Sequence, residues 1–129
     1  MKKQIEKIKN LLEGKPYIEF AYLFGSQAKG LADYRSDWDI AVYFNNDPKK
    51  FPAWTVFSLE AEISKEIGKE AQIITLNGLD SPVLIFQILK DGILLTDNDP
   101  EKRIVFEAKA LSKYHDYQYY LKRQMMQRI

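Results

Sequence analysis

Two short clusters of residues, close together in the sequence, have the types and spacing needed to bind a metal-bound phosphate. Gly25 and Ser26 follow an apolar run, and ten residues later Asp37 and Asp39 enclose a single tryptophan. Glycine permits a tight turn that lets backbone amides approach a phosphate, and the serine adds a hydroxyl. Residues two apart in a strand point to the same face, so both carboxylates should converge on one point. Oxygen ligands of this kind suit Mg²⁺.

Three residues between these clusters are further candidates for the same site. Lys29 and Arg35 could contact a phosphate, although cations on a short helix or turn are as often simply solvated. We interpret the hydroxyl of Ser36 as a turn or capping group rather than a catalyst, and group it with Lys29 among the nucleotide-binding candidates. Taken separately, each cluster is an ordinary strand end or a pair of solvated acids. The apolar strands on both sides favour one joint site.

Hydrophobic periodicity and the positions of Gly and Pro predict an α/β (α+β) fold, with a small mixed sheet and helices packed mainly on one side. We expect one domain spanning residues 1–129, because 46% apolar residues suffice for one core. The expected strands cover 17–24, 38–44, 71–76 and a short edge strand at 93–95. The expected helices are a first one closed by Gly14, a short one at 26–31, and longer ones over 56–67, 82–89 and about 99–125.

The last helix is a candidate docking element for a partner, because its apolar residues do not form one straight stripe. The stripe is expected to begin as Ile104, Ala108 and Leu111 and then to rotate towards Tyr114, Leu121 and Met125. The two halves should therefore face different neighbours.

The composition excludes several kinds of chemistry. The chain has no cysteine and a single histidine, His115, so a thiol nucleophile, a thiolate or histidine-rich metal cluster and a histidine-based triad cannot form within it. Nineteen Lys and Arg balance 18 Asp and Glu, so no net field recruits nucleic acid, and we do not expect nucleic acid as a partner. No apolar run is long enough for a membrane span. We expect a soluble, cytoplasmic protein.

The stretch from Gly25-Ser26 to Asp37-Trp38-Asp39 resembles the signature of the minimal nucleotidyltransferases of the DNA polymerase beta superfamily: Gly-Ser, ten residues, then Asp-x-Asp. The order of elements in the rest of the chain is also similar to that family. The resemblance implies a Gly-Ser hold on a nucleoside triphosphate, ATP or another, and Mg²⁺ on the two aspartates. It further implies transfer of a nucleoside monophosphate to an acceptor with release of pyrophosphate.

The sequence departs from the family at one position. Active members usually carry a third carboxylate on the next strand, where this chain has Ala71-Gln72-Ile73. A neutral amide is a poorer Mg²⁺ ligand than a carboxylate and cannot act as a general base. We therefore expect nucleotide binding to survive better than turnover. Glu70, two residues earlier on the same strand face, is a minor alternative for the missing ligand.

Small stand-alone members of the resembled family often pair with a helical HEPN protein as antitoxin and toxin, and some attach AMP to a toxin tyrosine. The resemblance therefore implies an antitoxin that transfers AMP to its partner. The alternative is a binding module that holds nucleotide without transferring it and blocks the toxin by contact through the last helix. The neutral Gln72 favours this alternative. Small-molecule modification, as in aminoglycoside nucleotidyltransferases, is a third class whose acceptor domain this chain lacks. Homo-oligomerisation stays open.

Overall fold

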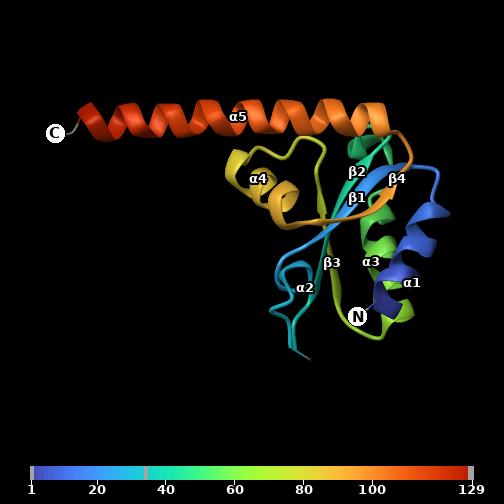
Figure 1. Cartoon of the computed structure of the whole chain (residues 1–129). Helices are drawn as coiled ribbons and strands as arrows, with labels where there is room; N and C mark the ends of the chain where they lie inside the picture. Colours follow the sequence, from blue (N-terminus) through green and yellow to red (C-terminus); the bar gives the residue numbers. More distant parts are fainter. Residues whose placement is uncertain (1, 34, 128–129) are drawn as a thin grey trace.

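The structure of the protein is a computed structural model that describes residues 2–33 and 35–127 (Figure 1). The strands and helices follow one another almost as the sequence predicts. The strands are β1 (Ile18–Phe24), β2 (Trp38–Phe44), β3 (Ala71–Thr75) and β4 (Ile93–Asp97). The helices are α1 (Lys2–Glu13), α2 (Ser26–Lys29), α3 (Thr55–Ile67), α4 (Pro82–Asp91) and α5 (Pro100–Gln127), with a 3₁₀ turn, η1, at Pro48–Lys50.

The four strands form one mixed sheet in the order β3-β2-β1-β4. β1 is antiparallel to both β2 and β4, and β2 is parallel to β3. The connection from β2 to β3 runs through α3, as a parallel pair requires. The α/β class and the mixed sheet are therefore confirmed, and β4 lies at a sheet edge as expected.

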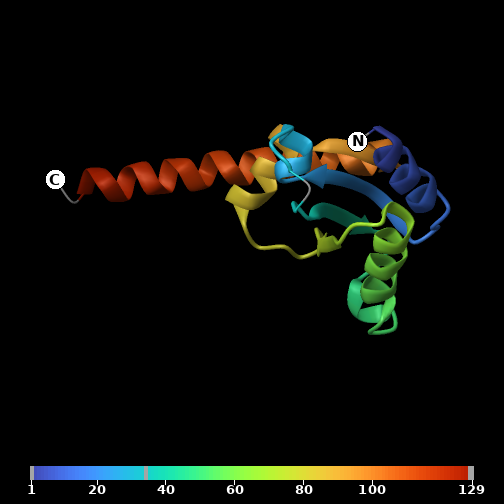
Figure 2. The same ribbon diagram turned by 90° about the horizontal axis from the view of Figure 1, so that it is seen from below.

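The helices cover both faces of the sheet rather than mainly one, which corrects the expectation from sequence. The larger core lies between the sheet and the pair α1 and α3, and it takes the even-numbered residues of β2, among them Trp38 and Ile40. A smaller core on the other face contains Ala41 of β2 together with residues of α4 and α5 (Figure 2). Because α4 is apolar on nearly every side, packing against this second face of the sheet buries side chains that would otherwise face water.

The free edge of β3 is closed by two side chains of α3 that lie one helical turn apart. The hydroxyl of Ser64 accepts a hydrogen bond from the Ala71 N–H at 3.0 Å, and a carboxylate oxygen of Glu60 accepts one from the Ile73 N–H at 2.8 Å. Unpaired amides on an edge strand would otherwise invite pairing with another chain. This capping fixes the strand that carries Gln72.

The stripe of α5 differs from the one expected. Ala110 is buried and Phe106 packs in the smaller core, whereas Ile104 is 57% and Leu111 42% exposed. The face of the helix turned towards the sheet also carries charged residues: Arg103 donates hydrogen bonds to Asp97 and Glu107, and Glu107 accepts another from the Tyr22 hydroxyl at 2.6 Å. A hydrophobic pattern treats such charges as outward-facing, so it selected the wrong face for Ile104, Ala108 and Leu111, whereas Tyr114 of the expected second half does lie on the packed face.

The second half of α5 extends beyond the rest of the molecule, past the N-terminal end of α4 (Figures 1 and 2). Within the described residues, no helix combines the length and the apolar character that crossing a bilayer would require.

Candidate active site

The bend after β1 is built around Gly25, which has φ 73° and ψ −155°. This conformation is open to glycine and strained for other residues. A Cβ at this position would also lie 2.6 Å from Oδ2 of Asp39. Glycine is thus required both for the turn and for the close approach of Asp39, and the turn and the carboxylate meet as the spacing predicts. Ser26 follows the bend directly and begins α2.

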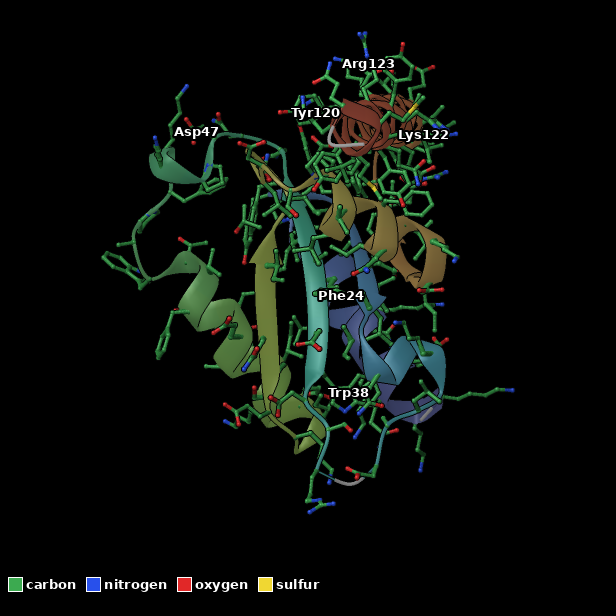
Figure 3. The ribbon with its side chains drawn as sticks, turned by 90° about the vertical axis from the view of Figure 1, so that its left-hand side faces the viewer. Phe24, Trp38, Asp47, Tyr120, Lys122 and Arg123 are labelled. Atoms are coloured by element: carbon green, nitrogen blue, oxygen red, sulfur yellow. The ribbon has the colours of Figure 1, made fainter. Side chains whose placement is uncertain are left out.

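Asp39 lies on β2, an inner strand of the sheet. It is close to the end of the sheet where the Gly25-Ser26 turn meets the aspartate pair. It is paired with Phe24 on β1 and with Gln72 on β3. The neighbouring Trp38 and Ile40 point to the opposite face, where they are 4% and 0% exposed. The side chain of Asp39 therefore emerges on the face that also carries Ala41 and the smaller core. Figure 3 looks onto the sheet from this side, with Phe24 and Trp38 labelled.

Asp37 lies close enough to Asp39 to affect its ionisation. Partial burial raises the pKa of Asp39 above its ordinary value, and the negative charge of Asp37 raises it further. Neither carboxylate forms an ion pair with a lysine or arginine among the residues that the structure describes. Two adjacent acids without a protein cation form a site that a divalent cation would stabilise.

Gln72 is the direct neighbour of Asp39 in the parallel ladder and shares its face of the sheet. The side chain is exposed, so its amide is available to a ligand. Glu70 lies just before β3, and its carbonyl accepts the Trp38 N–H at 3.0 Å. Over residues 2–33 and 35–127, no three His, Cys, Asp or Glu side chains gather into a metal site. Glu70 therefore does not complete the aspartate pair.

A residue that the sequence analysis overlooked connects the two motifs. Gln27, the second residue of α2, is only 7% exposed, and its Nε2 donates a hydrogen bond to the carbonyl of Ser36 at 3.4 Å. It thus joins the turn after Gly25 to the backbone just before Asp37. A polar residue on so short a helix gives no sequence signal of burial.

Two of the candidate nucleotide-binding residues are engaged elsewhere. Lys29 Nζ lies 3.8 Å from Oδ2 of Asp91, at the end of α4. The Ser36 hydroxyl accepts a hydrogen bond from the Asp33 N–H at 3.0 Å. The Asp33 carboxylate accepts another from the Arg35 N–H at 2.8 Å. Ser36 and Arg35 therefore shape the loop that leads into Asp37. Of the predicted site residues, the structure brings together Gly25, Asp37 and Asp39, with Ser26 adjacent.

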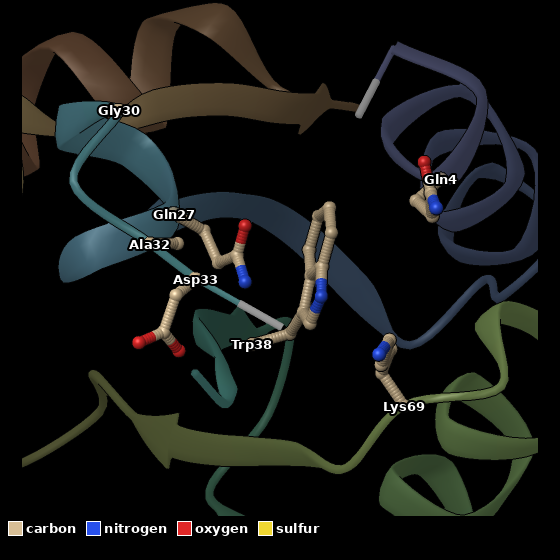
Figure 4. A pocket seen from close by; sticks show the side chains of 7 residues that line it. All are labelled: Gln4, Gln27, Gly30, Ala32, Asp33, Trp38 and Lys69. Carbon is tan, nitrogen blue, oxygen red and sulfur yellow. The ribbon is translucent and has the colours of Figure 1, made fainter. Parts of the chain in front are cut away.

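A cavity of about 250 Å³ lies behind the site, on the other face of β2 from Asp39 (Figure 4). Trp38 stands in it between the side chains of Gln27 and Gln4. The buried Oε1 of Gln4 has no hydrogen-bond partner among the described residues. Because β2 separates this cavity from the carboxylates, it is not part of the aspartate site.

Comparison with known proteins agrees with this geometry. The Polymerase beta, Nucleotidyltransferase family matches residues 6–101. A protein adenylyltransferase MntA of Aphanizomenon flos-aquae (strain 2012/KM1/D3) is 29% identical over 110 residues, covering 78% of this chain and 71% of the relative. A protein adenylyltransferase MntA of Shewanella oneidensis (strain MR-1) is 29% identical over 113 residues, covering 86% and 76%. In a crystal structure of a toxin-antitoxin with AMP-PNP, one chain is 25% identical with a TM-score of 0.73, over 95% of this chain and 94% of that one.

The family match covers well over half of the chain and includes the bend, both aspartates and the β3 strand. The protein therefore belongs to the Polymerase beta nucleotidyltransferase family, as the motif suggested.

Proposed function

We propose that this protein is a nucleotidyltransferase that moves AMP from ATP onto a hydroxyl of a partner protein, and that it acts as the antitoxin of that partner. The proposal rests mainly on the contact between Gly25 and Asp39, because this contact joins the candidate phosphate-binding turn to the candidate metal-binding aspartates. The two adenylyltransferase relatives and the toxin-antitoxin structure with AMP-PNP support the choice of nucleotide and acceptor. The expected partner is a helical, HEPN-type protein.

The residues present fit a magnesium-bound triphosphate. Asp37 and Asp39 would hold the metal, since Mg²⁺ in such sites is typically bound by one or two carboxylates together with substrate phosphates. A Mg²⁺ ion held by these two carboxylates would supply positive charge that offsets the negative charge developing during transfer. The turn at Gly25 brings its backbone close to the Asp39 carboxylate, and Ser26 follows it directly. Lys29 could join the phosphates only by leaving Asp91, and Ser36 only by leaving the loop.

In the proposed reaction the acceptor oxygen forms a bond to the α-phosphorus of ATP. The bond between that phosphorus and the oxygen bridging to the β-phosphate breaks, pyrophosphate leaves, and the acceptor proton passes to solvent. The contribution of the protein is to hold the nucleotide in line with the acceptor.

A second candidate function rests on Gln72. The amide stands beside Asp39, at the place in the ladder where a third metal-binding carboxylate would lie. A site with two carboxylates would hold nucleotide but would activate the acceptor poorly. In that case the chain binds nucleotide and neutralises its partner by direct contact.

The deciding experiment combines this chain, a helical protein encoded next to it, Mg²⁺ and ATP labelled at the α-phosphate. Transfer of label to the helical protein, lost in Asp37→Asn and Asp39→Asn, supports the enzyme. A stable complex and measurable nucleotide binding without label support the blocking function. If calorimetry with Mg²⁺ and ATP finds no nucleotide binding at all, both proposals fail.

A further inference from the structure

In its first half, α5 packs on the rest of the protein with one side of the helix. The same side continues without interruption into the second half, which extends beyond the rest of the protein. Ala110 is buried, and Tyr114 stacks on Phe86 of α4 with ring centroids 3.9 Å apart. Tyr117, Leu121 and then Met125 follow at the same spacing of three or four residues. This spacing keeps all five α5 residues on one side of a helix. We call the exposed part, Tyr117, Leu121 and Met125, the distal stripe.

The distal stripe has no cover among the described residues. Its three members are 37%, 41% and 69% exposed, although they continue a face that is otherwise packed. A helical segment of this length that packs on nothing is only marginally stable in water. A surface that covers the stripe would therefore both bury apolar area and hold the helix in place.

The charges beside the distal stripe have one sign. At 3.6 residues per turn, Lys113 and Lys122 flank the stripe on its two sides. The acid of this segment, Asp116, lies towards the outer side, as does Arg123, which is 5.9 Å from the ring of Tyr119. Figure 3, which looks along α5 from its C-terminal end, shows Tyr120 and Lys122 on opposite sides of the helix and Arg123 away from the sheet.

We propose that the distal stripe binds an amphipathic helix of the partner protein, with acidic residues flanking the apolar face of that helix. The bound helix lies along α5 beyond the N-terminal end of α4, and its acids pair with Lys113 and Lys122. This inference rests on the proposed function, because the occupant is the protein that this chain neutralises. It adds the surface used and the chemistry of the segment that binds there.

The charges argue against a second copy of this chain as the occupant. A copy would present the same stripe with the same lysines beside it, so the two surfaces would carry charge of the same sign. An acidic helix from another protein turns this repulsion into attraction.

The test uses the full chain and two synthetic helical peptides that share one leucine stripe, one flanked by glutamates and the other by lysines. Fluorescence anisotropy measures binding, and circular dichroism confirms that each variant is folded. We expect the glutamate peptide to bind at least tenfold more tightly than the lysine peptide. Tyr117→Ala should weaken that binding about tenfold, whereas the matched variant Tyr119→Ala, on the outer side of the same helix, should leave it unchanged. Lys122→Glu should remove most of the preference between the peptides, because only Lys113 then remains positive.

Equal binding of the two peptides, no binding of either, or equal losses from Tyr117→Ala and Tyr119→Ala would overturn the inference. A concentration-dependent dimer in light scattering that Tyr117→Ala dissociates would also overturn it, in favour of a second copy. Asp37→Asn separates the two proposals: it should abolish nucleotide transfer and leave peptide binding intact. Selective peptide binding by a chain that binds no nucleotide would reject the proposed function alone.

Discussion

Gly25 and Asp39 lie so close together that Asp39 leaves no space for a side chain at position 25: a Cβ on Gly25 would lie 2.6 Å from the Asp39 carboxylate. The same glycine has a positive φ, so the bend and the carboxylate depend on one residue without a side chain. The turn proposed to bind phosphate and the strand proposed to hold the metal therefore depend on each other's position.

Gly25→Ala should therefore damage both stability and nucleotide binding. A φ of 73° with a ψ of −155° is a conformation essentially restricted to glycine, so a residue with a Cβ costs about 1–3 kcal/mol there, and the overlap with Asp39 must displace the carboxylate. Gly30→Ala is the matched control, since Gly30 has φ 72° but nothing within 4 Å of its would-be Cβ. Thermal unfolding and calorimetry with Mg²⁺ and ATP measure the two effects. We expect both variants to lose stability and only Gly25→Ala to lose roughly tenfold or more in affinity, about 1.4 kcal/mol.

Asp39→Asn should make the protein more stable near neutral pH while removing metal binding. The pKa of Asp39 is raised by burial and by Asp37, so the folded state holds its proton more tightly than the unfolded chain does. Stability is then lost as pH rises from the ordinary aspartate value, about 3.9, through the raised one. The gain in unfolding temperature from Asp39→Asn should shrink as the pH is lowered towards that value. Added Mg²⁺ and ATP should stabilise only the parent protein. A variant that is less stable at every pH would contradict the argument.

Gln72→Asp should increase transfer of AMP, because it places a third carboxylate beside Asp39 on the same face. A gain of about tenfold would correspond to about 1.4 kcal/mol of transition-state stabilisation. Gln72→Asn is the control for a change of side-chain length without charge. Rates are measured with ATP labelled at the α-phosphate and the helical partner. If both variants transfer at the parent rate, the amide is not what limits catalysis.

Gln27→Leu should weaken nucleotide binding, because the amide of Gln27 ties the Gly25 turn to the carbonyl before Asp37. Loss of one hydrogen bond at this position should cost about 1 kcal/mol of stability. Gln4→Leu provides the comparison: it changes a glutamine of the same cavity whose buried Oε1 has no partner among the described residues, so stability should be unchanged or improved. Urea denaturation and calorimetry distinguish the two. Equal effects would show that the tie through Gln27 is unimportant.

Much of this protein could be predicted from local sequence signals. Ser81 caps α4 by accepting the Leu84 N–H, with Pro82 at the first helical position, as the Ser-Pro pair indicates. Successive side chains of the strand that contains Asp39 point to opposite faces of the sheet. The order Asp-Trp-Asp therefore already predicts that the two acids share one face and that the tryptophan lies on the other. These features depend on backbone geometry within a few residues, which the sequence by itself determined.

Other features were decided only when distant segments came together. Arg103 and Glu107 face the sheet because Asp97 and Tyr22 supply their hydrogen bonds, and no pattern within α5 reveals those partners. Lys29 lies near Asp91, 62 positions further along the chain, instead of being free for phosphate. A charge turns inward when the tertiary structure supplies its opposite, because its burial without a partner would cost too much. The order of residues therefore specified the candidate catalytic motif, and long-range pairing decided which way α5 faces and which of its apolar residues are left uncovered.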